Sequence, residues 1–441
     1  MHSPLLETPR DYATLKETLK NSNPVDLAEG LEDLDTDQAI KLFRMLPKDA
    51  AAEVFAYLSS DMQQLIVNAI KDHEISRIID ELFLDDAVDF IEEMPAGVVK
   101  RVLNNVPKDK REIINNFLKY PEGSAGSIMT IEYVDLKEFL TVAQAFDRIR
   151  RDGVDKETIY TCYVIDSGRR LLGAVSAKSL LLASPDDKIG DIMERDVIFA
   201  TTGDDKESIA NEFRRYGLLA MPVVDNENRL VGIVTVDDVM EVQEEEATED
   251  FELMAAMTPA DEPYLKTSIW AMTRNRLPWL LLLMLTATIT GSIISGFEDA
   301  LAVMPVLVTF IPMLMDTGGN AGSQSSTLVI RGMALEEINL SDVFVVWWKE
   351  LRVSALCGVG LGIVNFVRVI IFQKSATVAM SVSLALCATI ILSKTVGCLL
   401  PLFAKKIKLD PAVMASPVIT TIVDAGALLI FFGIAKIILH I

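Results

Sequence analysis

A run of 21 residues without a charged side chain, Leu277–Phe297, limits the folds open to this chain. At a rise of ~1.5 Å per residue, a helix of that length covers about 31 Å, which matches the hydrocarbon core of a bilayer. Four further apolar stretches follow, at about Leu301–Ile330, Val353–Phe372, Ala376–Phe403 and Pro411–Leu439. The C-terminal part is therefore predicted to cross a membrane five times.

Acidic residues are concentrated in the other part of the chain. Residues 269–441 hold 12 Lys and Arg against 9 Asp and Glu, which leaves 29 against 54 for residues 1–268. A part this acidic favours cations as partners and argues against nucleic acid, which needs a basic face. The four cysteines form no CxxC pair and only three histidines occur, so neither a disulfide framework nor a zinc site is expected. We also expect no enzyme, because no P-loop, nucleophile elbow or HExxH motif is present.

Basic residues predict the orientation of the spans, because they are enriched on the cytoplasmic side of a membrane. Arg274 and Arg276 precede the first span, which places the N-terminal domains in the cytoplasm, and the polar N-terminus has no signal-peptide pattern. The other residues expected inside are Arg331, Lys349, Arg352, Lys405, Lys406 and Lys408. The chain is thus predicted to be a multi-pass protein of the cell membrane, with its C-terminus on the extracellular or periplasmic side.

The second predicted span is polar for a membrane helix. Asp316, Asn320 and Gln324 are too polar to face lipid, and Ser323, Ser325 and Ser326 add hydroxyls. Gly318, Gly319 and Gly322 would let helix backbones approach each other closely. One interpretation is a small-residue helix interface held by hydrogen bonds. The interpretation that we favour is the wall of a polar pore.

The fifth predicted span carries an isolated acid, Asp424, with no Lys or Arg within ten residues. The span starts at Asp410, and Pro417 is expected to free a backbone carbonyl in the middle of the membrane. Asp424 would lie about 21 Å along the helix from Asp410. An unpaired carboxylate at that depth costs about 2.5 kcal/mol or more, so it should face water and a cation. A protonated Asp, or one that bonds to a neighbouring helix, is the alternative.

Residues 47–120 repeat with a period near 12 residues. Each repeat is predicted to be a short amphipathic helix, and the helices start near Pro47, Ser59, Lys71, Leu84, Pro95 and Pro107. Such short helices cannot each bury a face alone, so they should stack as a small superhelix. Asp85 and Asp89 share one helix face, where a divalent ion that bridges them would relieve their repulsion.

A second repeat occupies residues 124–243. The segment Cys162–Leu181 is similar to Ala220–Val239, and both have the order strand, strand, helix. The pair resembles a tandem of cystathionine-β-synthase-type (CBS) regulatory modules. That resemblance implies contacts with the ribose of a nucleotide from Gly232, Thr235 and Asp238. The first copy has Ser179 in the place of the aspartate, so at most one good adenosine site is implied.

A run of carboxylates follows the second repeat. Glu241–Asp250 holds six acidic residues in ten, and a solvated acidic helix is the plain interpretation. The run directly precedes Phe251–Thr273, which is predicted to be a helix that leads into the first span. Its position would allow it to transmit a force to the membrane part.

Taken together, the chain resembles the MgtE family of magnesium channels over essentially its whole length. Two motifs carry the resemblance: Pro312-x5-Gly318-Gly319-Asn320-x-Gly322-x-Gln324, and Asp410-Pro411-Ala412 followed by Pro417, Thr420, Thr421 and Asp424. The resemblance implies a homodimer with one pore on the two-fold axis, in which Asp424 coordinates hydrated Mg²⁺. It also implies cytosolic domains that bind Mg²⁺ and close the pore when intracellular Mg²⁺ is high, and ATP binding by the CBS modules.

The resemblance further assigns roles to individual residues. Pore-lining positions are Gly318, Gly319, Asn320, Gln324, Pro417, Thr420 and Thr421. Metal-binding positions are Asp424 and Asp410 in the membrane part, and Glu53, Asp85, Asp89, Asp205, Asp238, Glu241, Glu246, Glu249 and Asp250 in the cytosolic part. Gly217 stands where an acidic ligand is implied, so one regulatory site is expected to be absent or rearranged.

The predicted fold is therefore multi-domain. It has an acidic all-α superhelical domain at 1–123, α/β CBS modules at about 124–186 and 187–246, a linker or plug helix at 247–275, and a five-span α-helical pore domain at 276–441. A Mg²⁺ influx channel fits best, since hard oxygen ligands suit Mg²⁺, and selectivity against Co²⁺, Mn²⁺ and Ca²⁺ is left open. Two alternatives are a Na⁺- or H⁺-coupled divalent cation transporter and a membrane-anchored metal or nucleotide sensor that transports nothing.

Overall fold

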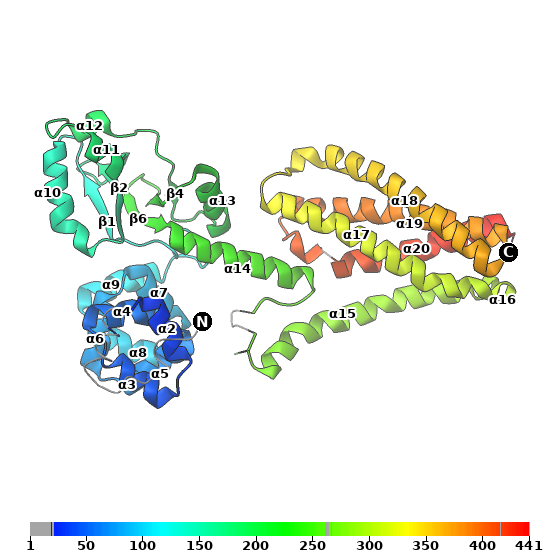
Figure 1. Cartoon of the computed structure of the whole chain (residues 1–441), viewed down its shortest axis with the longest axis horizontal. Helices are drawn as coiled ribbons and strands as arrows, with labels where there is room; N and C mark the ends of the chain where they lie inside the picture. Colours follow the sequence, from blue (N-terminus) through cyan, green and yellow to red (C-terminus); the bar gives the residue numbers. More distant parts are fainter. Residues whose placement is uncertain (1–18, 20–21, 261–263, 266, 415, 441) are drawn as a thin grey trace. The chain divides into compact units, whose positions relative to one another are not determined.

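The computed structural model describes residues 19, 22–260, 264–265, 267–414 and 416–440 (Figure 1). The chain forms two compact units, Met1–Gln243 and Glu244–Ile441, and helix α14 (Val236–Met254) belongs to both. The first unit combines short helices with two small sheets, and the second unit is helical.

All six repeat helices predicted for residues 47–120 are present. They are α4 (Lys48–Ala56), α5 (Ser60–Ala69), α6 (Asp72–Glu81), α7 (Leu84–Glu93), α8 (Ala96–Asn105) and α9 (Lys108–Phe117). Pro47, Pro95 and Pro107 are N-cap residues, a position at which proline sacrifices no intrahelical hydrogen bond. The helices share one apolar core that includes Phe55 and Phe90, whose rings meet edge to face at 5.1 Å. The prediction of stacked amphipathic helices is confirmed.

Among the described residues, two further helices of the N-terminal part precede the repeat, and neither was predicted. They are α2 (Pro24–Glu32) and α3 (Thr36–Phe43). Asn23 caps α2 by accepting a hydrogen bond from the amide of Val25, and Pro24 follows at the first helical position. The Asn-Pro pair was therefore a usable signal for a helix start.

Both copies of the second repeat form a three-stranded sheet. The first sheet contains β1 (Tyr133–Leu136), β2 (Thr158–Ile165) and β3 (Leu171–Ser176), and the second contains β4 (Ala200–Thr201), β5 (Ala220–Val224) and β6 (Leu230–Thr235). In each sheet the first strand pairs parallel to the second, and the last two strands are antiparallel. The accompanying helices are α10 (Val142–Asp152), α11 (Ala177–Leu182), α12 (Ile189–Ile192) and α13 (Lys206–Tyr216). The predicted strand-strand-helix order is confirmed in both copies.

The helical part and the second module share one apolar core. Val88 and Val102 of the helices belong to the same buried cluster as Met221, Val234 and Val239 of the second module. This core fixes α7 relative to the start of α14. The acidic side chains that both helices carry are therefore held near each other.

The prediction of a linker helix at Phe251–Thr273 is wrong. Helix α14 ends at Met254, and the next helix, α15 (Ile269–Gly296), begins at Ile269. Pro259 lies between the two helices, and proline can neither donate the helical hydrogen bond nor fit the helix interior. Ser268 then caps α15 by accepting from the amide of Ala271 at 3.2 Å. The acidic run itself lies within α14, as predicted.

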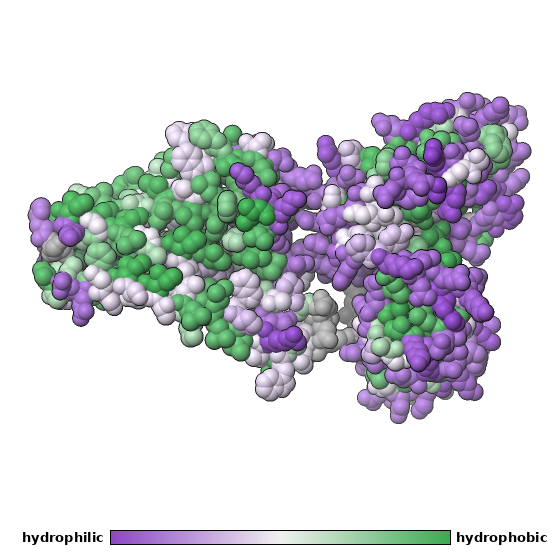
Figure 2. All heavy atoms as spheres, turned by 180° about the vertical axis from the view of Figure 1, so that it is seen from behind, coloured by the Kyte–Doolittle hydropathy of each residue, from purple (hydrophilic) through white to green (hydrophobic). Residues whose placement is uncertain are grey.

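Five long helices fill the second unit. Besides α15 they are α17 (Ile311–Ala334), α18 (Val343–Gln373), α19 (Ala376–Lys406) and α20 (Ser416–Leu439). By length and composition, four of the chain's described helices could cross a membrane, and they correspond to α15, α18, α19 and α20. Figure 2 shows hydrophobic side chains over most of the visible face of this unit, whereas the first unit is mainly hydrophilic.

Two predicted spans differ from the observed helices. The second is interrupted, because the short helix α16 (Glu298–Val303) and a 3-10 segment (Pro305–Phe310) precede α17. The fifth begins later than predicted, at Ser416, so Pro417 lies in the first turn of α20 and frees no carbonyl in the middle of the membrane. The oxygen of Pro417 instead accepts hydrogen bonds from the hydroxyls of Thr420 and Thr421, at 2.9 and 3.0 Å.

Candidate functional site

Carboxylates from both parts of the first unit meet in one group, the acidic cluster. It consists of residues of α7, of the loop before β2, and of α14: Asp85, Asp86, Asp89, Glu157, Asp237, Asp238 and Glu241. The sequence alone predicted Asp85, Asp89, Asp238 and Glu241 as metal-binding residues. The shared apolar core beneath α7 and α14 is what brings their side chains together.

Burial and mutual repulsion raise the pKa values across the acidic cluster. Burial, followed by the charge of Asp86, raises the pKa of Asp89 to about 8. Burial, followed by Asp237 and Asp238, raises the pKa of Glu157 to about 8 as well. Asp85 is only 8% exposed. Its burial, followed by the charge of Asp238, raises its pKa well above the ordinary value. Burial and the neighbouring acids thus disfavour the charged forms of these carboxylates when no cation is beside them.

The acidic cluster contains acids that sequence reasoning missed. Asp86 adjoins a predicted residue and could have been included, but Glu157 lies far from α7 in sequence and carries no motif. The Oε2 oxygen of Glu157 is buried and has no hydrogen-bond partner. Within the described part of the chain, no three His, Cys, Asp or Glu side chains lie close enough to hold a metal ion directly. Carboxylate oxygens, which all members of the cluster carry, are ligands that suit Mg²⁺.

Two other predicted cytosolic metal residues are not members of the acidic cluster, and one of them, Asp205, has a local structural role. Asp205 is the N-cap of α13 and accepts from the amide of Ser208 at 3.3 Å. Glu53 lies on α4, where its charge reaches Tyr57. Gly217 ends α13 with a φ of +63°, a left-handed conformation that favours glycine. That backbone requirement explains why no acidic side chain stands at this position.

The second unit holds a smaller acidic group at the end of α14. Burial, followed by Asp410 and then Glu246 and Glu249, raises the pKa of Asp250 to about 6, and Arg331 acts in the opposite direction. Met254 packs against the apolar cluster of Val329, Ile330 and Met333 at the end of α17 and of Cys398 and Leu402 in α19. The four acids that the sequence assigned to metal binding here are therefore near one another.

The predicted nucleotide residues lie on β6 and at the start of α14. Gly232 pairs with Val223, and a Cβ at Gly232 would lie 2.8 Å from the backbone oxygen of Thr130, which explains the glycine. The Thr235 hydroxyl donates to the Asp238 carboxylate at 2.6 Å. In the first module, Ser176 and Ser179 form the corresponding pair at 2.8 Å.

Asp424 lines a pocket of about 270 Å³ in the second unit. Its walls come from α15, α17 and α20, and include Leu283, Ala287, Thr290, Met315, Pro417, Thr420 and Thr421. The hydroxyls of Thr286 and Thr421 are 3.4 Å apart and join α15 to α20 beside this pocket. Carboxylate and hydroxyl oxygens are its main polar groups, and such oxygens are the ligands that Mg²⁺ prefers.

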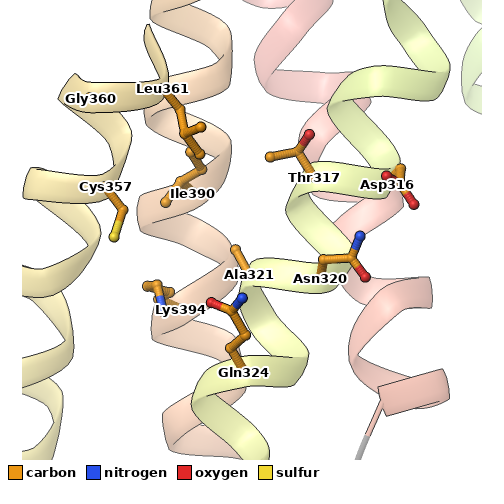
Figure 3. Close-up of a pocket in the computed structure, with 10 residues that line it drawn as sticks. All are labelled: Asp316, Thr317, Asn320, Ala321, Gln324, Cys357, Gly360, Leu361, Ile390 and Lys394. Carbon is orange, nitrogen blue, oxygen red and sulfur yellow. The ribbon is translucent and has the colours of Figure 1, made fainter. Parts of the chain in front are cut away.

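The polar residues of α17 line a second, larger pocket of about 550 Å³. Asp316, Asn320 and Gln324 border it together with residues of α18 and α19, among them Cys357 and Lys394 (Figure 3). The glycines of α17 lie elsewhere. A Cβ at Gly318 would lie 2.8 Å from Thr389 of α19, and one at Gly319 would lie 2.9 Å from Thr420 of α20. The polar residues thus border a cavity while the glycines permit close helix packing.

Comparisons with known proteins give the family of this chain. A family model described as divalent cation transporter matches residues 311–434, one for the MgtE intracellular N domain matches residues 22–123, and one for the CBS domain matches residues 189–245. The magnesium transporter MgtE of Thermus thermophilus is 34% identical over 98% of this chain and 96% of its own length. This chain belongs to the MgtE family of magnesium transporters. MgtE of Bacillus subtilis is 33% identical over 98% of this chain and 94% of its own.

Solved structures resemble the cytosolic part of this MgtE-family chain. The cytosolic domain of the Mg²⁺ channel MgtE in complex with ATP is 35% identical, with a TM-score of 0.50, over 53% of this chain and 95% of that one. The soluble part of a magnesium transporter is 29% identical, also with a TM-score of 0.50, over 53% of this chain and 97% of that one.

Proposed function

We propose that this chain is a Mg²⁺-selective channel that mediates Mg²⁺ influx and closes when cytosolic Mg²⁺ binds to its acidic parts. The observation that carries the proposal is the Asp424 pocket, in which one carboxylate and threonine hydroxyls face a cavity between α15, α17 and α20. An acidic side chain within the membrane is costly unless it contacts water or a cation. Mg²⁺ flux into liposomes that contain the purified protein tests the proposal directly.

The gate that we propose is the pair of acidic groups. Without a divalent cation, the carboxylates of the acidic cluster repel one another, and so do those around Asp250. Mg²⁺ would neutralise both groups and favour a compact closed state, which makes the gate a two-state element biased by ion binding. We further propose that the carboxylate of Asp238 takes part in Mg²⁺ binding by the acidic cluster. Glu157 is proposed to bind the ion there together with Asp89 and Asp85.

We also propose that the channel is a homodimer with one pore on its two-fold axis, with the N-terminal units in the cytoplasm and the C-terminus outside. Large apolar side chains on the first unit favour a protein partner. Val154 is 83%, Leu181 72% and Leu182 79% exposed, although the first unit contains none of the apolar spans. Cross-linking of the protein in membranes would test the dimer.

A coupled transporter is the second candidate. A channel passes Mg²⁺ down its own gradient alone, whereas a Na⁺- or H⁺-coupled transporter or exchanger stops when the second gradient is removed. Flux that depends on an imposed Na⁺ or H⁺ gradient would replace the channel proposal. The same liposomes, with Co²⁺, Mn²⁺ and Ca²⁺ in place of Mg²⁺, would measure selectivity.

The raised pKa values predict how pH affects the cytosolic part. Asp89 and Glu157 hold protons more tightly when folded, so the metal-free fold is favoured at low pH and loses stability as the pH rises toward 8. A soluble fragment of residues 1–253 in EDTA should therefore melt about 5 °C lower at pH 8.5 than at pH 6. Mg²⁺ should raise the melting temperature more at pH 8.5, because it then competes with fewer protons. A Mg²⁺ effect that is equal at both pH values would contradict this account of the cluster.

ATP is proposed to bind at the second module. The hydrogen bond from Thr235 to Asp238 orients the pair that the CBS resemblance assigns to a ribose. Thr235→Ala should weaken ATP binding ~10-fold in calorimetric titration, since one hydrogen bond to a charged group is lost. Ser176→Ala is the matched control in the first module and should leave the affinity unchanged. Equal losses in the two variants would show that the second module is not the specific site.

A further inference from the structure

The second unit buries a lysine and a glutamate that the proposed function does not use. Lys394 of α19 and Glu350 of α18 are 3.7 Å apart, and their side chains are 7% and 13% exposed. Charged residues within membrane helices are costly and rare, and a buried pair adds little to stability compared with apolar residues of similar size. Ala376–Phe403 was predicted as one apolar stretch, so the lysine within it, Lys394, was not among the predicted site residues.

Ser325 of α17 joins this pair. The Ser325 hydroxyl donates to the Glu350 carboxylate at 2.6 Å, and the Lys394 ammonium donates to the Ser325 oxygen at 3.2 Å. Each of the three helices thus contributes one group to the same hydrogen-bonded triad. The negative charge of Glu350 compensates the ammonium at this depth, and the triad fixes where the ammonium lies.

Lys394 borders the larger pocket, whereas Glu350 does not. Figure 3 shows Lys394 of α19 and Gln324 of α17 facing the same space between the helices. Asp316, Asn320 and Gln324 are spaced four residues apart on α17 and present oxygen atoms over about 12 Å. Such a stripe attracts cations, and Lys394 places one positive charge at its Gln324 end.

We propose that Lys394 controls how tightly cations are held as they pass along the α17 stripe. It is a fixed positive charge at the inner end of the α17 stripe, and it weakens cation binding there so that an ion is released instead of being retained. Conduction requires binding that is favourable enough for entry and weak enough for exit. Glu350 and Ser325 are positioning residues, because they hold the ammonium at the wall without bordering the pocket. The inference rests on the proposed transport of Mg²⁺ and adds a path along the α17 stripe to it.

The test compares Mg²⁺ flux of full-length variants in liposomes over a range of Mg²⁺ concentrations. Lys394→Met combined with Glu350→Gln removes the wall charge without leaving a buried charge unpaired. We expect its KM for Mg²⁺ to fall ~10-fold and its maximal flux to fall as well, because release slows. Lys394→Arg should stay closer to the wild-type KM than Lys394→Met. Lys436→Met, which removes an exposed lysine of α20 outside the pocket, is the matched control with an unchanged KM.

A structural role for the pair would give a different result. A double variant with the wild-type KM and maximal flux, or one that loses flux only in proportion to a lowered melting temperature, overturns the inference. Asp316→Asn gives a second measurement at an exposed position, and its KM should rise ~10-fold because the stripe loses its carboxylate. If the double variant cannot be purified, an unchanged KM in Asp316→Asn overturns the inference. Absent Mg²⁺ flux in the wild-type protein would refute the proposed function itself.

Discussion

Asp424→Ala is expected to abolish Mg²⁺ flux, with a loss of ~100-fold or more in liposomes. The substitution removes the one carboxylate that lines the pocket between α15, α17 and α20 and leaves its hydroxyls in place. Mg²⁺ gives up its water reluctantly and is held through charge and an ordered water shell. Hydroxyls carry no charge, so they cannot by themselves offset the free-energy cost of bringing a divalent ion into an apolar layer.

The control for this variant is Asp299→Ala. Asp299 lies in the short helix α16 and does not line the pocket, so its loss removes the same charge and should leave flux unchanged. Both variants should still form the dimer and melt at the wild-type temperature. Wild-type flux from Asp424→Ala would show that passage of the cation does not need this carboxylate.

Asp89→Asn combined with Glu157→Gln is expected to leave the channel open at millimolar cytosolic Mg²⁺. Asp89 comes from the helical part and Glu157 from the first module, so the pair tests whether Mg²⁺ joins these two parts. Two unit charges 4 Å apart repel by about 4 kcal/mol at an effective dielectric constant of about 20. Asp89 and Glu157 are both repelled by Asp86 and Asp238, so the double variant weakens the repulsion that opens the metal-free state. It also removes two of the carboxylates through which Mg²⁺ would reverse that repulsion.

Limited proteolysis and flux report on this gate together. In the wild-type protein, residues 1–275 should resist protease better in millimolar Mg²⁺ than in EDTA, and flux should stop at high Mg²⁺. In the double variant both Mg²⁺ effects should be lost. Asp147→Asn with Glu227→Gln removes two exposed acids outside the cluster and should behave like wild type. Equal cleavage of the wild-type protein with and without Mg²⁺ would refute the gating mechanism.

Several features of the fold followed from local sequence patterns. The period near 12 residues predicted α4 to α9, because each short helix needs its own start signal and its own apolar face. The apolar stretches predicted most of α15, α18, α19 and α20 for a similar reason, since a bilayer sets a minimum length. Helix ends were less predictable. The break between α14 and α15 and the late start of α20 depend on prolines whose effect changes with their position in the helix.

By itself, the sequence determined the domain types, the family resemblance and the presence of an isolated intramembrane acid. Only the tertiary structure decided which charges meet. Glu157 joins Asp85 and Asp86 through packing between segments far apart in the chain, and Lys394 meets Glu350 only because α18 and α19 lie side by side. Local patterns encode helices and strands, since these depend on near neighbours. The electrostatics of a site depend on distances across the fold, which no local pattern encodes.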